Sequence, residues 1–328
     1  MNEQGIDIKE NFLNELDPEL LRILLRDRSS NKNIVWATSD YERYGKDYEK
    51  TSRIFPRLIT GDNGEIIKPR IDKTDYLQTT RSRDNGEVFT PSWICNKQNN
   101  LIDERWFNRK DVFNVEKGDK WETNMKKIRF PKGKKWQDYV LDTRLEITCG
   151  EAPYLVSRYD TVTGEIIDIK NRIGLLDRKL RIVSENTDNH IDWLYWAKKS
   201  LENIYAYEFQ GDNLLLAREN IFVTFNDYYK QKFDNDLELD FLYEIAEIIS
   251  WNIFQMDGLK YVVPFSCQMK KEITTDLYGN EVVDEIECMG CKKGYINQHN
   301  GTYCKIKDWD TGKKIKFIDL IKEDEQND

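Results

Sequence analysis

The sequence of 328 residues has no apolar run near the length of about 20 residues that a membrane-spanning helix needs. Its first ten residues, MNEQGIDIKE, have neither the basic start nor the apolar core of a secretion signal. Both absences predict a cytoplasmic protein, in which the cysteines stay reduced and serve as thiols or metal ligands. Histidine is also scarce, because the chain has two, His190 and His299. This argues against a catalytic metal centre built from several histidines.

An excess of positive charge is also missing. Lys and Arg together number 50 against 59 Asp and Glu, which gives a formal net charge of −9. Such a chain does not coat nucleic acid with its whole surface, so any such contact needs a local basic face. Aromatic residues make up 12% of the sequence and include 9 Trp, which excludes a disordered polar chain. The length is sufficient for a sizeable core.

Hydrophobic periodicity indicates an N-terminal helical and loop-rich arm over residues 1–86. Apolar residues recur at helical spacing over 9–27, where Asp17 and Pro18 mark the start of a second helix. Residues 61–69, GDNGEIIKP, carry the turn residues of a hairpin or loop. This part of the chain is therefore rich in turns as well as helices.

Residues 87–263 are expected to form the main domain. Strand-like apolar runs alternate there with helical stretches at 192–203, 212–230 and 237–251, and this alternation predicts an α/β sheet. Residues 264–328 differ in character, because they combine short alternating strands, glycine turns, four cysteines and an acidic tail. The sequence thus predicts an arm, an α/β domain and a small C-terminal module.

Three strand-like runs of the expected sheet end in residues that suit a nucleotide cofactor. Gly150 follows the first run, where a glycine lets a ligand approach the backbone and the free N–H groups of the next helix. Glu208 ends the second run, the place where an acid binds ribose hydroxyls in doubly wound folds. Asp257 ends the third, where a carboxylate can accept a hydrogen bond from a base amino group.

Each of these residues also has a simpler interpretation. A glycine after a strand forms an ordinary turn, Glu208 suits a surface carboxylate or a helix cap, and Asp257 suits a turn. The occurrence of all three, in order and each at a strand end, favours the cofactor site over chance.

Four segments resemble the N6-adenine DNA methyltransferases of restriction-modification systems, often labelled M subunits. Residues 87–91, EVFTP, resemble the Phe-Thr-Pro segment that covers bound S-adenosylmethionine in that family. Residues 145–155, LEITCGEAPYL, align without gaps with the methionine-binding motif Leu-Asp-Pro-Ala-Cys-Gly-Ser-Gly-x-Phe-Leu. Residues 204–221 resemble the second-strand motif, and 252–259 resemble the motif that meets the cofactor's adenine. Their order is the family's order, over about 87–260.

The resemblance implies a Rossmann-like S-adenosylmethionine-dependent methyltransferase core. It implies that Gly150 and its neighbours hold the methionine end, that Glu208 binds the ribose, and that Asp257 binds the adenine. The Phe-Thr-Pro segment would close over the cofactor. The cofactor-binding residues implied in this way are Phe89, Thr90, Pro91, Glu146, Thr148, Cys149, Gly150, Glu208, Phe209, Asp257 and Gly258.

The sequence departs from the family in ways that bear on activity. Glu146 stands where the family has Asp, and Ala152, followed by Pro153, stands at the second glycine and restricts the loop. The catalytic tetrapeptide, Asn or Asp followed by Pro-Pro and an aromatic, does not occur in this sequence. In the family it hydrogen-bonds the flipped adenine and stacks on its ring. Three explanations remain open. The catalytic half is on a partner subunit, a different motif carries out catalysis, or the protein is a non-catalytic relative.

Four cysteines in the C-terminal module have the spacing C-x20-C-x2-C-x12-C, which favours a zinc site over four unrelated thiols. Pairing of strands about a turn at 277–280 would bring the first cysteine beside the C-x2-C turn. A second hairpin with its tip at 298–301 would return the chain to the last cysteine. Four thiolates fill a tetrahedron, so the predicted zinc is structural. His299 is expected at an exposed hairpin tip, although it could replace one ligand. The predicted ligands are Cys267, Cys288, Cys291 and Cys304.

A basic loop is the candidate nucleic-acid contact, with a solvated loop as the alternative. Asp168 and Lys170 offer a short match to a metal-dependent nuclease, but a second acidic partner upstream is not evident. The basic residues predicted to contact phosphate are Lys126, Lys127, Arg129, Lys132, Lys134 and Lys135.

Together these features predict an S-adenosylmethionine-binding, DNA adenine-N6 methyltransferase-like protein with structural zinc, from a restriction-modification or phage or mobile-element system. DNA and a second subunit that carries the catalytic motif are the expected partners, and no membrane contact is expected. The alternative is a non-catalytic DNA- or protein-binding relative, such as an anti-restriction or regulatory factor.

Overall fold

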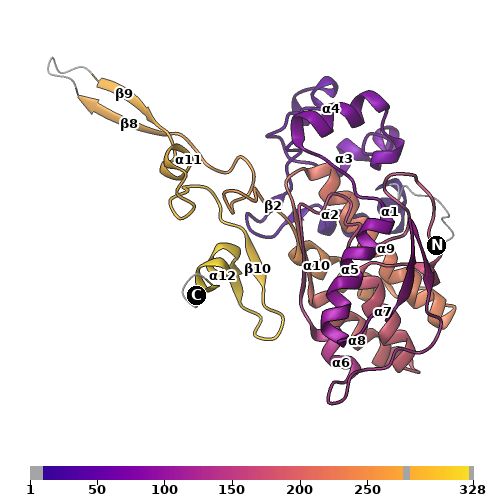
Figure 1. The fold of residues 1–328 in the computed structure, drawn as a ribbon. Helices are drawn as coiled ribbons and strands as arrows, with labels where there is room; N and C mark the ends of the chain where they lie inside the picture. The colour runs from indigo at the N-terminus through magenta and orange to yellow at the C-terminus, as the bar shows by residue number, and fades with distance from the viewer. Residues whose placement is uncertain (1–9, 276–280, 325–328) are drawn as a thin grey trace.

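A computed structural model of the chain describes residues 10–275 and 281–324. Figure 1 shows a body of helices around a small sheet, with a C-terminal part that extends away from it. None of the helices in these two ranges combines the length and the apolar character needed to span a membrane.

The central sheet has three parallel strands in the order β5, β6 and β7. They are β5 (Arg144–Ile147), β6 (Ile204–Glu208) and β7 (Ile253–Gln255). Glu146 lies opposite Ala206, and Tyr207 lies opposite Phe254. All three carboxyl ends therefore meet at one edge, and the chain is a mixed α/β protein.

Two helices make each connection between the parallel strands. The chain runs from β5 through α7 (Leu175–Asn186) and α8 (His190–Glu202) to β6. It then runs through α9 (Gly211–Phe233) and α10 (Leu239–Asn252) to β7. The helices predicted at 192–203, 212–230 and 237–251 are thereby confirmed. α9 is buried along most of its length, which explains why its sequence is apolar on more than one face.

The two faces of the sheet have different coverings. Along β6, Ile204 and Ala206 are fully buried and belong to the core shared with the helices. Tyr205 and Tyr207 alternate with them and pack against the C-terminal module. The alternation follows from the period of two in a strand. On β5, Leu145 and Ile147 lie on the same face as the two tyrosines and are exposed by 45% and 61%.

The N-terminal arm packs into the main core instead of forming a core of its own. Asp17 caps the second helix by accepting the N–H of Glu19 at 2.7 Å, which confirms the predicted helix start. Val35 and the side chain of Gln255 in β7 exchange two hydrogen bonds of 2.8 Å. The elements of this part are α1 (Glu10–Leu16), α2 (Pro18–Leu24), β1 (Arg26–Asp27), β2 (Lys32–Asn33), η1 (Glu42–Tyr44), η2 (Lys46–Tyr48), α3 (Pro56–Ile59), η3 (Gly61–Asn63), η4 (Arg70–Asp72) and α4 (Asp75–Asn85).

Between the arm and the sheet, α5 (Ser92–Phe107) is a long helix on the outside of the body (Figure 1). Pro91 occupies the N-cap position without a side-chain capping bond, and Asn108 ends the helix in the left-handed conformation. The segment that follows contains β3 (Asn114–Lys117), β4 (Lys120–Thr123) and α6 (Trp136–Leu141), and η5 (Ile169–Asn171) lies between β5 and α7.

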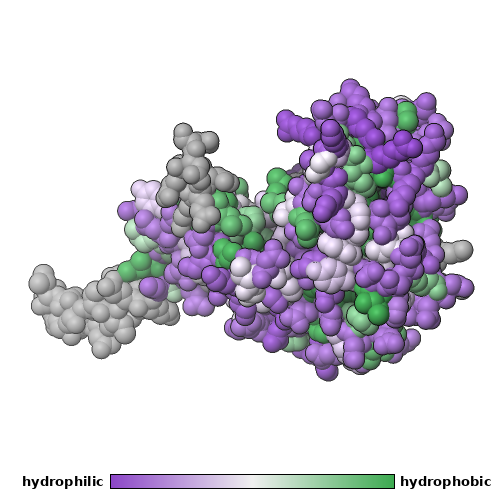
Figure 2. Space-filling view, turned by 90° about the horizontal axis from the view of Figure 1, so that it is seen from below, coloured by the Kyte–Doolittle hydropathy of each residue, from purple (hydrophilic) through white to green (hydrophobic). Residues whose placement is uncertain are grey.

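The C-terminal module has its own small core on the second face of the sheet. Phe254 of β7 packs against Phe317 with 5.4 Å between ring centroids, and Tyr207 packs 6.0 Å from the same ring. The predicted turn at 277–280 lies outside the described residues. The elements are β8 (Lys270–Thr275), β9 (Glu281–Ile286), α11 (Met289–Lys293), β10 (Lys305–Lys307), β11 (Lys314–Lys316) and α12 (Phe317–Asp324). Figure 2 shows hydrophobic side chains gathered where this part meets the body, on a surface that is otherwise mostly hydrophilic.

Candidate functional site

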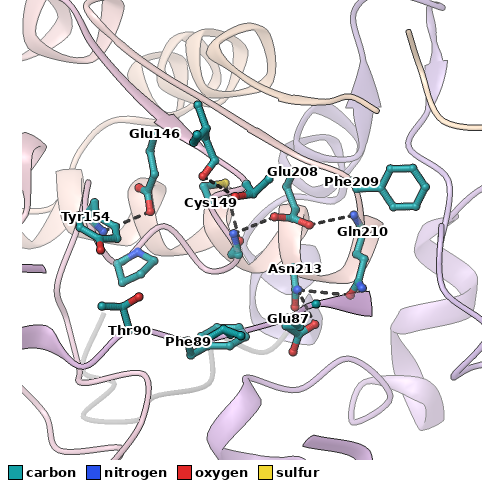
Figure 3. Close-up of a pocket in the computed structure, with 16 residues that line it drawn as sticks. Glu87, Phe89, Thr90, Glu146, Cys149, Tyr154, Glu208, Phe209, Gln210 and Asn213 are labelled. Carbon is teal, nitrogen blue, oxygen red and sulfur yellow. Dashed lines mark hydrogen bonds between the residues drawn. The ribbon is translucent and has the colours of Figure 1, made fainter. Parts of the chain in front are cut away.

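A cavity of about 530 Å³ opens at the carboxyl ends of β5 and β6 (Figure 3). Three segments that were predicted to bind a cofactor converge there: the Phe-Thr-Pro segment, the loop after β5, and the end of β6. The cavity is lined by Gly86, Glu87, Val88, Phe89, Thr90, Glu146, Ile147, Thr148, Cys149, Gly150, Pro153, Tyr154, Glu208, Phe209, Gln210 and Asn213.

The loop after β5 has an unusual backbone. Thr148, Gly150 and Ala152 have φ angles of +47°, +53° and +63°, in the left-handed region. Only glycine adopts this region freely, and a β-branched residue such as Thr148 adopts it at a cost of about 1–2 kcal/mol. Such strain persists where the surrounding structure enforces it, and it is concentrated at binding sites. The alanine at the second glycine position therefore keeps the left-handed conformation.

Glu208 fastens this loop to the neighbouring strand. The N–H of Gly150 donates to Oε2 of Glu208 at 2.8 Å, and the N–H of Gln210 donates to Oε1 at 3.1 Å. Burial raises the pKa of Glu208, although both N–H groups act in the opposite direction. The carboxylate is thus held in place at the cavity wall, and no Lys or Arg of the described residues pairs with it.

Glu146 is a second buried carboxylate on the same wall. It accepts hydrogen bonds from the N–H groups of Tyr154 at 3.4 Å and Leu155 at 3.2 Å. Burial raises the pKa of Glu146 to about 8, against the effect of these two N–H groups. The cavity lining in the described part of the chain contains no Lys, Arg or His. The wall therefore favours a ligand that brings positive charge or hydrogen-bond donors.

A buried cluster of charges fixes the segment that closes the cavity. Nε of Arg81 donates to Oε2 of Glu87 at 2.6 Å, and Nδ2 of Asn213 donates to the same oxygen at 2.9 Å. Arg81 also pairs with Asp212 at 2.8 Å and with Asp40 at 2.7 Å. Although burial acts to raise the pKa of Asp212, Arg81 and a neighbouring lysine hold it below its ordinary value.

Phe89 stands two residues after Glu87, which the charge cluster holds in place. Its ring lies against the loop beside Gly150, where an added Cβ would be 3.5 Å from the ring. The guanidinium of Arg70 lies 5.0 Å from the ring centroid. Figure 3 shows Phe89 and Thr90 on the side of the cavity opposite Glu146 and Glu208. The segment is thus held as one wall of the cavity.

Three residues predicted to bind the cofactor lie outside the cavity lining. Pro91 occupies the N-cap position of α5, and Asp257 and Gly258 are not part of the cavity lining. Asp257 accepts the N–H groups of Leu259 at 3.1 Å and Lys260 at 3.2 Å, the geometry of a turn. It is also paired with the Lys260 ammonium at 3.2 Å. The simpler interpretation of Asp257 therefore holds, because its oxygens stabilise the turn after β7.

Gln210 and Asn213 line the cavity without having been predicted. Both stand at the start of α9, and their side chains contact each other at 3.4 Å. Amides at a helix start are common for capping reasons alone, so the sequence carried no specific signal for them. Asn213 binds Glu87, which is 126 positions away along the chain, and Gln210 binds Arg81, which is 129 positions away.

The second site is a cluster of three cysteines and one histidine in the C-terminal module. The ligand atoms of Cys267, Cys288, Cys291 and His299 all lie within 4.8 Å of one another. Nδ1 of His299 lies 3.6 Å from the Cys267 sulfur, 3.7 Å from the Cys288 sulfur and 3.6 Å from the Cys291 sulfur. With Zn–S distances of about 2.3 Å and Zn–N of about 2.0–2.1 Å, a tetrahedron has S···N edges of about 3.5 Å. The cluster can therefore hold a metal ion such as zinc.

Two glycines allow the ligands to come this close. A Cβ on Gly290 would lie 2.6 Å from Nδ1 of His299, so only glycine fits under the imidazole ring. A Cβ on Gly301 would lie 2.5 Å from Oγ of Ser266 and 2.9 Å from the Cys267 sulfur. The N–H of Asn300 donates to the Cys288 sulfur at 3.2 Å, an interaction that stabilises a thiolate.

The prediction of four cysteine ligands is wrong in one member. Cys304 is fully buried, and its thiol donates to the carbonyl of Gln255 at 3.2 Å, inside the small hydrophobic core. His299 takes the fourth position and is buried, not exposed at a hairpin tip. The structure therefore agrees with the alternative that His299 replaces one cysteine ligand. Cys304 stands directly before β10, and its side chain points into the small core.

The predicted basic loop lies far from the cavity. Nζ of Lys134 donates to the carbonyl of Trp106 at 3.0 Å, next to the end of α5. The start of α5 adjoins the Phe-Thr-Pro segment, and a helix of 16 residues is about 24 Å long. Residues 126–135 and the cavity therefore lie at opposite ends of this helix.

Comparison of the chain with protein-family models, with curated proteins and with solved structures found no match. The cavity and the metal cluster are therefore interpreted from their own residues.

Proposed function

We propose that the chain binds S-adenosylmethionine in the cavity at the ends of β5 and β6. The observation that carries the proposal is the pair Glu146 and Glu208, two buried carboxylates on a cavity wall that has no basic side chain. The cofactor has a sulfonium, an ammonium and ribose hydroxyls, and these groups match acidic acceptors. A cavity of about 530 Å³ is within the range of sites for small cofactors.

The residues have distinct roles in this proposal. The methionine end lies against Glu146 and the loop around Gly150, and the oxygens of Glu146 accept hydrogen bonds from its ammonium. Glu208 accepts from the ribose hydroxyls, and Phe89 covers the bound molecule. The cofactor supplies a methyl group on a positively charged sulfur. The chain contributes by fixing that group's direction and by excluding water.

We infer further that the protein is the cofactor-binding part of a DNA adenine-N6 methyltransferase-like system, in a restriction-modification, phage or mobile-element setting. The sequence lacks the catalytic tetrapeptide of that family. β5 pairs with β6 along one edge and with no other strand among residues 10–275 and 281–324. Parallel strands are usually paired and covered on both faces, and Leu145 and Ile147 are exposed here. This open edge supports a second protein that carries the catalytic motif and completes the site.

The missing tetrapeptide equally favours a second candidate, a DNA- or protein-binding relative without catalysis. In that case the cofactor has a regulatory or structural role, and no partner restores methyl transfer. The two candidates share the cofactor site, and they predict different results in the methyl-transfer assay described below.

Calorimetric titration with S-adenosylmethionine tests the cofactor site first. We expect one molecule per chain, with affinity lowered by about 10-fold or more in Glu208→Gln, because a hydrogen bond to a charged group is worth about 1.5–3 kcal/mol. Asp257→Asn is the matched control: it removes a carboxylate after the neighbouring strand, outside the cavity, and should leave the affinity unchanged. Wild-type protein that binds no cofactor would refute the proposal.

Methyl transfer to adenine-containing DNA is then measured with the chain alone and with candidate partners that carry Asn-Pro-Pro-aromatic. Transfer that appears only with a partner supports the split enzyme. Cofactor binding without transfer in any combination supports the non-catalytic relative.

For the cysteine and histidine cluster we propose a structural zinc ion. Three sulfurs and one imidazole nitrogen fill a tetrahedron and leave no position for a reactive water molecule. The ion would tie the two ends of the β8–β9 hairpin to the segment before β10.

A further inference from the structure

Four lysines form one face of the β10–β11 hairpin. Lys305 lies directly opposite Lys316, and Lys307 lies directly opposite Lys314. Between them Ile306 lies opposite Ile315, and both of these side chains pack into the small core of the module. Because side chains alternate along a strand, the four ammonium groups share the other face, which is called the lysine face below.

This arrangement costs stability. Like charges directly opposite each other on two strands repel and weaken the pairing. None of the four lysines has a carboxylate within 4.0 Å among the described residues. The nearby Asp308 is occupied within its turn, where it accepts the N–H groups of Asp310 at 2.9 Å and Thr311 at 3.1 Å. The positive charge of the lysine face is therefore not neutralised within the described chain.

Aromatic rings support the lysines from beneath. Nζ of Lys307 lies 4.1 Å from the ring centre of Trp309, and Nζ of Lys314 lies 5.0 Å from that of Trp251. Nζ of Lys316 lies 5.4 Å from the ring of Tyr303. These contacts hold the long side chains in place and leave the charge available to an external anion.

The N-terminal arm extends the positive surface. The guanidinium of Arg28 lies 5.8 Å from the same Trp251 ring, and Nε of Arg28 donates to Oγ of Ser250 at 2.7 Å. Oγ of Ser29 accepts the N–H of Lys305 at 2.8 Å, which fixes the arm against β10. Segments that are more than 200 residues apart in the sequence thus converge on one basic surface.

The identity of the ligand follows from what the surface can offer. It offers lysines whose Cβ atoms are about 5 Å apart across the strands and about 7 Å apart along them. The indole N–H of Trp309 is used by Asn252 at 2.8 Å, and the Trp251 ring is buried, so the Trp309 N–H is not available to a base and Trp251 offers no open face. A repeating polyanion backbone fits this surface, and base recognition does not.

We propose that the lysine face binds the sugar-phosphate backbone of duplex DNA. The choice of DNA rests on the proposed function, whereas the phosphate contact rests on the lysines themselves. In a chain with a net charge of −9, this surface gives the local positive potential that such binding requires.

The metal cluster positions the lysine face. The N–H of His299 donates to Oη of Tyr303 at 3.0 Å, and the same tyrosine lies under Lys316. Cys304, the next residue, leads directly into β10. Ordering of His299 by a metal ion therefore orders the start of the hairpin, and DNA binding should depend on the metal.

The test is fluorescence anisotropy of a labelled 30-base-pair duplex with the full chain at several salt concentrations. Lys314→Gln with Lys316→Gln removes one member of each opposed pair. We expect the slope of log K against log salt to fall by about 2, because each phosphate contact contributes about 0.9. Affinity at low salt should fall by about 10-fold or more.

The matched control is Lys117→Gln with Lys120→Gln. These two exposed lysines also lie directly opposite each other on an antiparallel hairpin, between β3 and β4. We expect no change in slope or affinity. Both variants should melt cooperatively and keep their metal and cofactor stoichiometry, and the Lys314 and Lys316 variant should melt no lower than wild type because repulsion is relieved.

Several results would overturn the inference. One is an equal loss of DNA affinity in the lysine-face variant and in the control variant. Another is loss of DNA binding with Lys126→Gln and Lys127→Gln instead. A third is binding of the protein to phosphatidylserine vesicles but not to duplex DNA. Because cofactor titration uses a separate cavity, a protein that binds duplex through this face without binding S-adenosylmethionine would refute the proposed function alone.

Discussion

The carboxylate of Glu208 accepts the backbone N–H of Gly150 at 2.8 Å and so joins the ends of β5 and β6. An acid in this position does two things at once. It holds a left-handed loop in shape, and it presents its remaining acceptor sites to the cavity. The cavity is thus formed before any ligand arrives, which lowers the entropy cost of binding.

Glu146 predicts how stability depends on pH. Its pKa is about 8 in the folded protein, against about 4.3 for an ordinary Glu, so between these values the folded state binds a proton that the unfolded state does not. Stability is therefore fully present below the lower value and is lost as the pH rises toward 8. We expect the free energy of unfolding to fall by up to about 1.4 kcal/mol per pH unit in this window.

Urea unfolding at pH 5, 6, 7 and 8 checks this dependence. Glu146→Gln cannot ionise and should remove most of the slope. If the stability of the wild-type protein rises from pH 5 to pH 8, burial does not raise the pKa of Glu146 as stated.

The metal ligands can be distinguished by two substitutions. His299→Ala removes the fourth ligand and should lower zinc affinity by more than about 10-fold, the lower bound for losing even an outer partner. Cys304→Ala should keep one zinc per chain, because that thiol bonds Gln255 outside the cluster. Metal analysis of purified protein gives the answer. Zinc that is retained in His299→Ala and lost in Cys304→Ala would restore the assignment made from the cysteine spacing.

Gly290 tests the geometry of the same cluster. Gly290→Ala places a methyl group 2.6 Å from Nδ1 of His299, so the ring must move and zinc affinity should fall. Gly294→Ala is the control, because that glycine has φ +72° but nothing within 4 Å of an added Cβ. It should cost about 1 kcal/mol of strain and leave the metal bound. Competition with a chromogenic chelator measures both affinities, and equal values would refute the steric argument.

Arg81 predicts the strength of the buried charge cluster. Arg81→Met leaves Asp212 and Glu87 without their main positive partner, and an unpaired buried charge costs about 3–5 kcal/mol. Arg22→Met breaks an exposed pair with Glu19 instead and should cost about 0–1 kcal/mol. Chemical unfolding compares the two variants. A loss below about 1 kcal/mol in Arg81→Met would mean that the cluster does not hold the arm in place.

The sequence predicted well where local patterns decide the structure. The helix start at Asp17 and the helices at 192–203, 212–230 and 237–251 were predicted, and the structure confirms them as α2, α8, α9 and α10. Gly150 and Glu208 were expected at strand ends in one cofactor site, and both line the same cavity. These predictions needed only the period of each element and its order along the chain.

The predictions that failed depended on long-range packing. Cys304 has the spacing of a ligand, but the register of β10 against β11 turns its thiol into the core. Asp257 stands at a strand end like Glu208, yet its oxygens bind within the turn and to Lys260, and it is not part of the cavity lining. Arg81 reaches Asp212 across 131 positions, and no local pattern indicates such a contact.

Both ends of the β8–β9 hairpin enter one cluster: Cys267 stands just before β8, and Cys288 just after β9. A metal ion in this cluster would join the two ends of the β8–β9 hairpin at its base. The length of the hairpin strands is then independent of the fold of the body. Adding paired residues to β8 and β9 would lengthen the hairpin without moving the cysteine and histidine cluster. This makes the hairpin a natural place to attach a reporter or a foreign binding sequence.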